Sequence, residues 1–318
     1  MTIIETELPV LGNDEPIPVV VDVDGIPISG RFAPAPQPRA VIVALHGGAT
    51  TSAYYDCPGH PELSLLRTGR AAGFTVIALD RPGYGSSLPF GDQLADGQLR
   101  VDLMYGAVDR ILGELPRGAG LFVLAHSAGC ELAVRMAADA ERGADLLGLE
   151  LSGSGRERQP YADEILSVRP RPDNVKVGKL LWQPGWLYPP EHVGGRLIGA
   201  NGPRYEGTLV NEWAGEIFPV LGPRVRVPVR FTVADHEQVW RNDPEGMPAV
   251  AELFPAVPRL VFATQYHAGH NISVGRTAGA YHLQALAFAE ECVVARESGE
   301  NAGPAVPFNG ATAPGQRS

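Results

Sequence analysis

The sequence predicts an α/β fold, in which a mostly parallel central sheet carries helices on both faces. Three observations support this class. Short, continuous apolar runs recur along the chain, and such runs are typical of strands buried on both faces. Segments with apolar residues at helical spacing alternate with these runs. An antiparallel hairpin is predicted ahead of them, and one long insertion separates two of the later strands.

The hairpin is predicted for residues 19–32, because Asp24-Gly25 stands between two apolar stretches and favours a tight turn. Two stripes of apolar residues at helical spacing predict two helices, one between strands and one near the C-terminus. The first stripe consists of Met104, Val108, Ile111, Leu112 and Leu115, and the second of Tyr281, Ala285, Phe288 and Cys292. The buried strands of the sheet are expected at residues 41–45, 74–79, 121–125, 146–149, 229–233 and 260–263.

Two parts of the chain depart from this alternation. Residues 156–222 separate two predicted strands, are rich in Pro, Gly and aromatic residues, and are predicted to form a cap, or lid, over one end of the sheet. The core domain is then expected to comprise residues 1–155 and 223–296. Residues 297–318 contain few side chains that could pack, so they are expected to be a disordered tail.

Composition excludes several classes of protein. The chain of 318 residues has 26 Lys and Arg against 36 Asp and Glu, a net charge of −10, and no basic run, which argues against nucleic-acid binding. Its three cysteines, Cys57, Cys130 and Cys292, are scattered and indicate neither a disulfide framework nor a zinc site. No signal peptide or long apolar stretch is evident. We therefore expect a cytoplasmic protein without a membrane partner.

A strand followed by His126-Ser127-Ala128-Gly129 and a helix-forming stretch predicts a nucleophile elbow. Small residues two positions before and after the serine let the strand and the helix approach closely, and the sharp turn projects the hydroxyl outward. Ala125 stands where such motifs usually have their first glycine, a small and sterically acceptable change. Cys130, in the helix after the turn, is expected only to pack.

A second glycine-rich turn, His46-Gly47-Gly48, follows the first buried strand. Glycines allow the backbone to approach a substrate carbonyl, where N–H groups stabilise a developing oxyanion. We predict that the oxyanion hole consists of the Gly48 and Ala128 N–H groups. His46 is expected to shape the turn rather than to transfer protons.

Together with Asp80-Arg81-Pro82-Gly83-Tyr84-Gly85-Ser86-Ser87 and Gly269-His270-Asn271, these motifs resemble those of the α/β-hydrolase superfamily over residues 17 to 296. The resemblance implies an α/β-hydrolase fold, with an N-terminal hairpin, a mostly parallel sheet and a cap insertion. It also implies a triad in the order serine, acid, histidine. The Gly-His pattern selects His270 as the base, and His267 is the competing candidate. No third ligand accompanies this His-x-x-His pair, so no metal is predicted.

The acid is expected after the strand at residues 229–233. The pattern of the family places it at Glu237, and Asp235, two residues earlier, is the alternative. Glu150, at the end of the preceding strand, is a third candidate. Any of these carboxylates could accept the Nδ1–H of the imidazole and stabilise its charged form.

The predicted function is that of a serine hydrolase that cleaves an ester, thioester, lactone or amide bond of a small, apolar or bulky substrate through an acyl-enzyme, with no cofactor. His270 would take the proton of Ser127 during attack and later activate the hydrolytic water. Two alternatives stay open. The first is a non-hydrolytic member of the family, namely an acyltransferase, a C–C hydrolase or a lyase. The second is a catalytically silent binding protein. The sequence carries no signal for the oligomeric state.

Aromatic residues of the cap have two interpretations. They either line an apolar substrate pocket above Ser127 or form a small core of the cap itself. The residues in question are Trp182, Trp186, Tyr188, Trp213 and Phe218.

Overall fold

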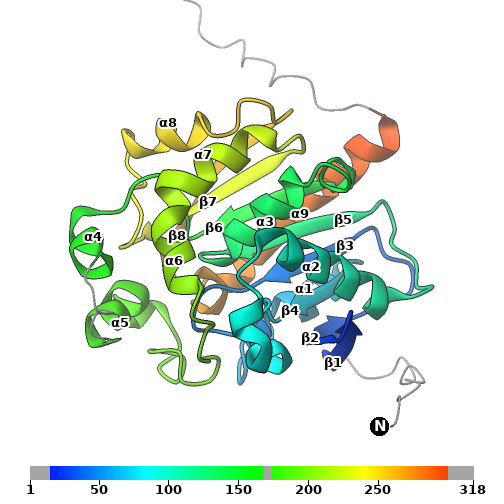
Figure 1. The fold of residues 1–318 in the computed structure, drawn as a ribbon, viewed down its shortest axis with the longest axis horizontal. Helices are drawn as coiled ribbons and strands as arrows, with labels where there is room; N and C mark the ends of the chain where they lie inside the picture. The colour runs from blue at the N-terminus through cyan, green and yellow to red at the C-terminus, as the bar shows by residue number, and fades with distance from the viewer. Residues whose placement is uncertain (1–14, 168–173, 300–318) are drawn as a thin grey trace, which may run out of the picture.

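The computed structural model describes residues 15–167 and 174–299, and within them a single sheet of eight strands in the order β1-β2-β4-β3-β5-β6-β7-β8 (Figure 1). The six strands from β3 onward are parallel to one another, whereas β1 pairs antiparallel with β2 and β2 with β4. The strands are β1 Ile17–Val23, β2 Ile26–Ala33, β3 Val41–Leu45, β4 Thr75–Leu79, β5 Leu121–His126, β6 Gly148–Ser152, β7 Val229–His236 and β8 Leu260–Gly269. The predicted fold class is confirmed.

The predicted hairpin is formed by β1 and β2. Val23 pairs with Ile26, so Asp24 and Gly25 are the two turn residues, with φ of 53° and 85°. Two successive positive φ angles are what a two-residue hairpin turn requires, and Asp-Gly adopts them readily. The side chain of Asp22 accepts the Gly25 N–H at 3.0 Å.

Helices cover both faces of the sheet (Figure 1). All five residues of β3 are fully buried, and alternate ones face opposite layers: Val41, Val43 and Leu45 pack with α2, α3 and α7, whereas Ile42 and Ala44 pack with α1 and α9. This two-sided burial explains the continuous apolar run. The helices are α1 Leu65–Ala71, α2 Gly97–Leu112, α3 Gly129–Ala138, α4 Pro160–Leu166, α5 Asn174–Trp182, α6 Glu206–Glu212, α7 Phe218–Leu221, α8 Gly246–Ala251 and α9 Ala278–Ser298.

Some element boundaries differ from those predicted. Helix α2 ends at Leu112, because Gly113 adopts a φ of 48° and breaks the helix before Leu115. The strand expected at residues 146–149 begins at Gly148 and continues to Ser152. At the other end of the chain, Glu297 and Ser298 extend α9 rather than the predicted tail, and Glu297 pairs with Arg39 at 3.0 Å. The rest of that tail, from residue 300, lies outside the described residues.

The segment predicted as the cap, residues 156–222, contains α4, α5, α6 and the short crossover helix α7. Figure 1 shows α4, α5 and α6 on the left, beside the body formed by the sheet and its helices. Among the residues that the structure describes, no helix has the length and apolarity needed to cross a bilayer.

Candidate active site

Ser127 lies in the sharp turn between β5 and α3, with a φ of 52°. This left-handed conformation costs an L-residue roughly 1–3 kcal/mol, so neighbouring contacts have to maintain it. Ser127 N donates to Ser152 O at 2.8 Å, and Ser127 O accepts from Cys130 N at 2.9 Å. Gly129 needs its small size, because a Cβ there would lie 2.4 Å from Leu45 O.

His270 and Glu237 complete a hydrogen-bonded chain that begins at Ser127. Glu237 immediately follows β7, and His270 immediately follows β8. His270 Nδ1 lies 2.9 and 3.0 Å from the two carboxylate oxygens of Glu237, and its Nε2 lies 3.1 Å from Ser127 Oγ. Because a carboxylate only accepts, Nδ1 carries the proton and Nε2 accepts from the serine hydroxyl. The side chains of His270 and Glu237 are only 3% and 2% exposed, so water competes little for these bonds.

The other candidates for the acid and the base take no part in this series of hydrogen bonds. Asp235 accepts the N–H groups of His267 and Ala268 at 2.9 and 3.0 Å, and thereby holds the end of β8. His267 is exposed. Glu150 is fully buried and pairs with Arg230 at 2.8 Å. Burial raises the pKa of Glu150 despite the opposing effect of Arg230. The structure thus brings Glu237, and not Asp235 or Glu150, to His270.

The turn after β3 brings Gly47 and Gly48 against the elbow. A Cβ on Gly47 would lie 3.2 Å from Ser127 Cβ, and one on Gly48 would lie 3.8 Å from Ala128 Cβ. Within residues 15–167 and 174–299, neither the Gly48 N–H nor the Ala128 N–H donates to a protein acceptor. Both are therefore available to a bound oxygen atom.

Two buried histidines flank this turn. His46 Nε2 accepts the Arg81 N–H at 3.0 Å, which requires an unprotonated nitrogen. Burial and the charge of Arg81 lower the pKa of His46 to about 4, so it is neutral at pH 7. The ring of His126 stacks on Tyr54 and meets that of His270, with centroids 4.9 and 5.0 Å apart. Burial and the neighbouring His270 lower the pKa of His126 well below its usual value.

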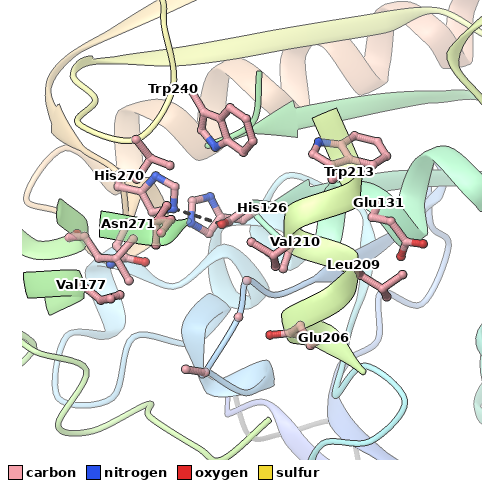
Figure 2. A pocket seen from close by; sticks show the side chains of 18 of the residues that line it. His126, Glu131, Val177, Glu206, Leu209, Val210, Trp213, Trp240, His270 and Asn271 are labelled. Carbon is pink, nitrogen blue, oxygen red and sulfur yellow. Dashed lines mark hydrogen bonds between the residues drawn. The ribbon is translucent and has the colours of Figure 1, made fainter. Parts of the chain in front are cut away.

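A cavity of about 200 Å³ opens beside Ser127 and His270. Its walls combine core loops with the cap. Figure 2 shows Leu209, Val210 and Trp213 along one helical segment of the cap, on the far side of the cavity from His270, and Trp240 on the side of His270 and His126. The apolar lining consists of Leu166, Val177, Leu181, Leu209, Val210, Trp213, Val239 and Trp240.

The charged side chains around the cavity are paired within the protein. Glu131 pairs with Arg100 at 2.7 Å, and Arg158 donates to Val210 O at 2.7 Å. Arg81 pairs with Glu206 at 2.6 Å. With these charges already satisfied, the cavity suits a neutral, apolar group better than an ion.

The aromatic residues predicted to line a pocket separate into different environments. Trp213 lies in the cavity wall, donates to Ser154 Oγ at 3.0 Å and stacks on Phe218. Trp182 and Tyr188 instead contact each other, with centroids 5.1 Å apart, inside a buried cluster that includes α1 and α9. Trp186 is 59% exposed and packs against His236. The structure does not bring Trp182, Trp186 or Tyr188 to the cavity.

Several cavity residues were not singled out from the sequence. Trp240, the fourth tryptophan, lies in the cavity wall and follows Glu237 by three residues. This closeness to a candidate acid was the signal in the sequence that could have placed it at the site. Glu206 carried no such signal, because its place depends on how the cap folds back over the core. Arg81 lies in the Asp-Arg-Pro-Gly motif, and nothing in that motif indicates that its side chain faces a cavity.

The family of the chain follows from comparison with known proteins. A family profile described as "Alpha/beta hydrolase family" matches residues 42–291. The chain therefore belongs to the alpha/beta hydrolase family, and this membership supports a hydrolase. Among curated proteins, Protein ABHD14A of Danio rerio is 40% identical over 67 residues, which represent 21% of this chain and 23% of that protein. The match thus spans about a quarter of the length of this relative.

Solved structures share the fold. The monoacylglycerol lipase of Paleococcus ferrophilus is 19% identical, with a TM-score of 0.58 over 83% of this chain and 99% of that one. A thioesterase domain from the curacin biosynthetic pathway is 18% identical, with a TM-score of 0.56 over 86% and 99% of the two chains.

Proposed function

We propose that the protein is a serine hydrolase that cleaves esters or thioesters of short to medium acyl groups through an acyl-enzyme intermediate. The observation that carries this proposal is the hydrogen-bonded chain from Glu237 through His270 to Ser127, which ends in the apolar cavity. Family membership supports a hydrolase, and the solved relatives described above include a lipase and a thioesterase.

In the first half of the reaction, Ser127 Oγ attacks the acyl carbonyl while its proton passes to His270 Nε2. Glu237 accepts the Nδ1–H, keeps the ring in the required tautomer and stabilises the imidazolium. The negative charge on the former carbonyl oxygen is stabilised by the N–H groups of Gly48 and Ala128. One such donor contributes about 3–4 kcal/mol to transition-state stabilisation. His270 then protonates the leaving group.

In the second half, a water molecule gives its proton to His270 and attacks the acyl-enzyme, which releases the acid and restores Ser127. The cavity supports a limited acyl length. Because a dry cavity of about 150 Å³ holds benzene, one of about 200 Å³ accommodates roughly six to eight carbons. Trp213 and Trp240 in its walls favour an apolar chain over a charged one.

The proposal is tested with a fluorophosphonate probe and a panel of p-nitrophenyl esters from two to twelve carbons. We expect the wild type to be labelled and to prefer acyl chains of up to about eight carbons over longer ones. Ser127→Ala should abolish labelling and turnover, whereas Ser167→Ala, at an exposed serine distant in sequence, should change neither. Undiminished labelling of Ser127→Ala would disprove the assigned nucleophile. A wild type that neither reacts with the probe nor hydrolyses any ester would disprove the function.

A further inference from the structure

A cap residue, Glu206, contacts the core beside the proposed oxyanion hole. Glu206 begins α6 and is only 9% exposed. Its Oε2 accepts from Arg81 Nη2 at 2.6 Å, and its Oε1 accepts from the Tyr84 hydroxyl at 2.6 Å. Burial disfavours the charged guanidinium, but Glu206 together with Tyr84 and Tyr205 outweighs this effect, and the pKa of Arg81 is raised. The carboxylate therefore has two strong donors, both from the loop after β4.

Both donors also hold the turn that carries Gly48. Arg81 Nη2 donates to Gly47 O at 3.1 Å, and the Tyr84 hydroxyl accepts the Ala49 N–H at 2.9 Å. These two bonds fix the residues on either side of Gly48. Ala49 itself has a φ of 54°, a conformation that an alanine keeps only when its surroundings impose it.

Glu206 also lies directly against Gly48. A Cβ on Gly48 would be 2.7 Å from Glu206 Oε1, so the carboxylate can approach the turn only because residue 48 is glycine. Without the carboxylate, the Tyr84 hydroxyl would lose its acceptor and Arg81 would become an unpaired buried cation. Both losses favour rearrangement of the two groups that hold Gly47 and Ala49.

We propose that Glu206 is a positioning residue that fixes the direction of the Gly48 N–H, so that the oxyanion hole is complete only when the cap is seated on the core. This inference rests on the proposed function. Glu206 makes no contact with the reacting atoms; it acts through Arg81 and Tyr84. Because the bound ester carries no oxyanion and the charge develops only as Ser127 attacks, the contribution of Glu206 belongs to kcat rather than to substrate binding.

A purely structural role for Glu206 in holding the cap makes a different prediction, and the adjacent residue provides the matched control. The Tyr205 hydroxyl donates to Pro82 O at 2.5 Å, a second bond between cap and core that does not touch the turn at Gly48. If cap attachment alone matters, Tyr205→Phe and Glu206→Gln should have similar effects.

The test compares wild type, Glu206→Gln and Tyr205→Phe on the best ester of the panel. Two inhibitors accompany it: a trifluoromethyl ketone, which forms a tetrahedral oxyanion on Ser127, and the corresponding alcohol, which does not. We expect Glu206→Gln to lower kcat and the affinity for the ketone about ten- to a hundredfold, somewhat less than the loss of a whole oxyanion donor. KM and the affinity for the alcohol should change by less than about threefold, as should every parameter of Tyr205→Phe.

Equal kcat in Glu206→Gln and wild type would overturn the inference, as would a loss of equal size in KM and alcohol binding. Tyr84→Phe keeps the ring and removes the shared hydroxyl, so it decides the question if Glu206→Gln does not fold. It should reproduce the loss in kcat, and the double variant should lose less than the product of the two single effects. Failure of the proposed function is recognised separately, because the wild type itself would then hydrolyse no ester.

Discussion

The core loops and the cap both border the cavity, but they reach it by different means. Ser127, Glu237 and His270 each stand directly after a strand, so the sheet itself places them. Leu209, Val210 and Trp213 belong to short cap segments whose position depends on tertiary contacts such as the pair between Glu206 and Arg81. The sheet thus determines which polar side chains meet at the site, whereas the packing of the cap determines the shape of the cavity beside them.

The largest effect expected on the core side comes from Glu237, the proposed triad acid. Glu237→Gln should lower kcat about 10⁴-fold, because an amide at this position favours the wrong tautomer of His270. Asp235→Asn should retain activity within about tenfold and mainly lower the free energy of unfolding, by about 1–3 kcal/mol, since Asp235 holds two backbone N–H groups. Ester kinetics and urea unfolding distinguish the two. The reverse order of kinetic effects would assign the acid to Asp235.

The tryptophans of the cap should show the next largest effects. Trp182→Ala should lower the free energy of unfolding by about 3–5 kcal/mol, because it empties part of a buried cluster. Trp186→Ala, at an exposed position, should change it by less than about 0.5 kcal/mol. Trp213→Ala should move the preferred ester toward longer chains, with a ratio of kcat/KM values shifted about tenfold or more. A shift in chain preference with Trp186→Ala alone would contradict the placement of the cavity.

A smaller effect is expected in the core, on the free energy of unfolding at acidic pH. His282 in α9 is fully buried, and burial lowers its pKa to about 3. The unfolded chain therefore binds more protons than the native state below pH ~6.5, and stability falls as the pH drops from there toward 3. At about 1.4 kcal/mol per pH unit, His282 accounts for a loss of about 2 kcal/mol between pH 8 and pH 5.

His282→Leu should remove this loss, as urea unfolding at the two pH values would show. His60→Gln serves as the control in the contact between core and cap: Glu191 raises the pKa of the partly exposed His60, and ion pairs near the surface contribute little to stability. An unchanged pH difference in His282→Leu would refute the assignment.

The sequence predicts more of the core than of the cap, and the reason is physical. Buried strands produce continuous apolar runs, and the motifs after them single out Ser127, Glu237 and His270, which the structure brings together. Their catalytic roles stay predictions. Cap helices are short, and aromatic residues in them are apolar whether they face a cavity or a core. Trp182 and Trp213 are therefore alike in sequence and differ only in what the folded chain places beside them.

The left-handed backbone at Ser127 has a consequence for how this protein can change. A glycine there would adopt a φ of 52° without strain, so replacing the serine would make the fold more stable while removing its hydroxyl. Selection for thermal resistance alone would thus favour loss of the hydroxyl. If Ser127 is the nucleophile, as proposed, this turn is a local instance of the trade-off between stability and activity.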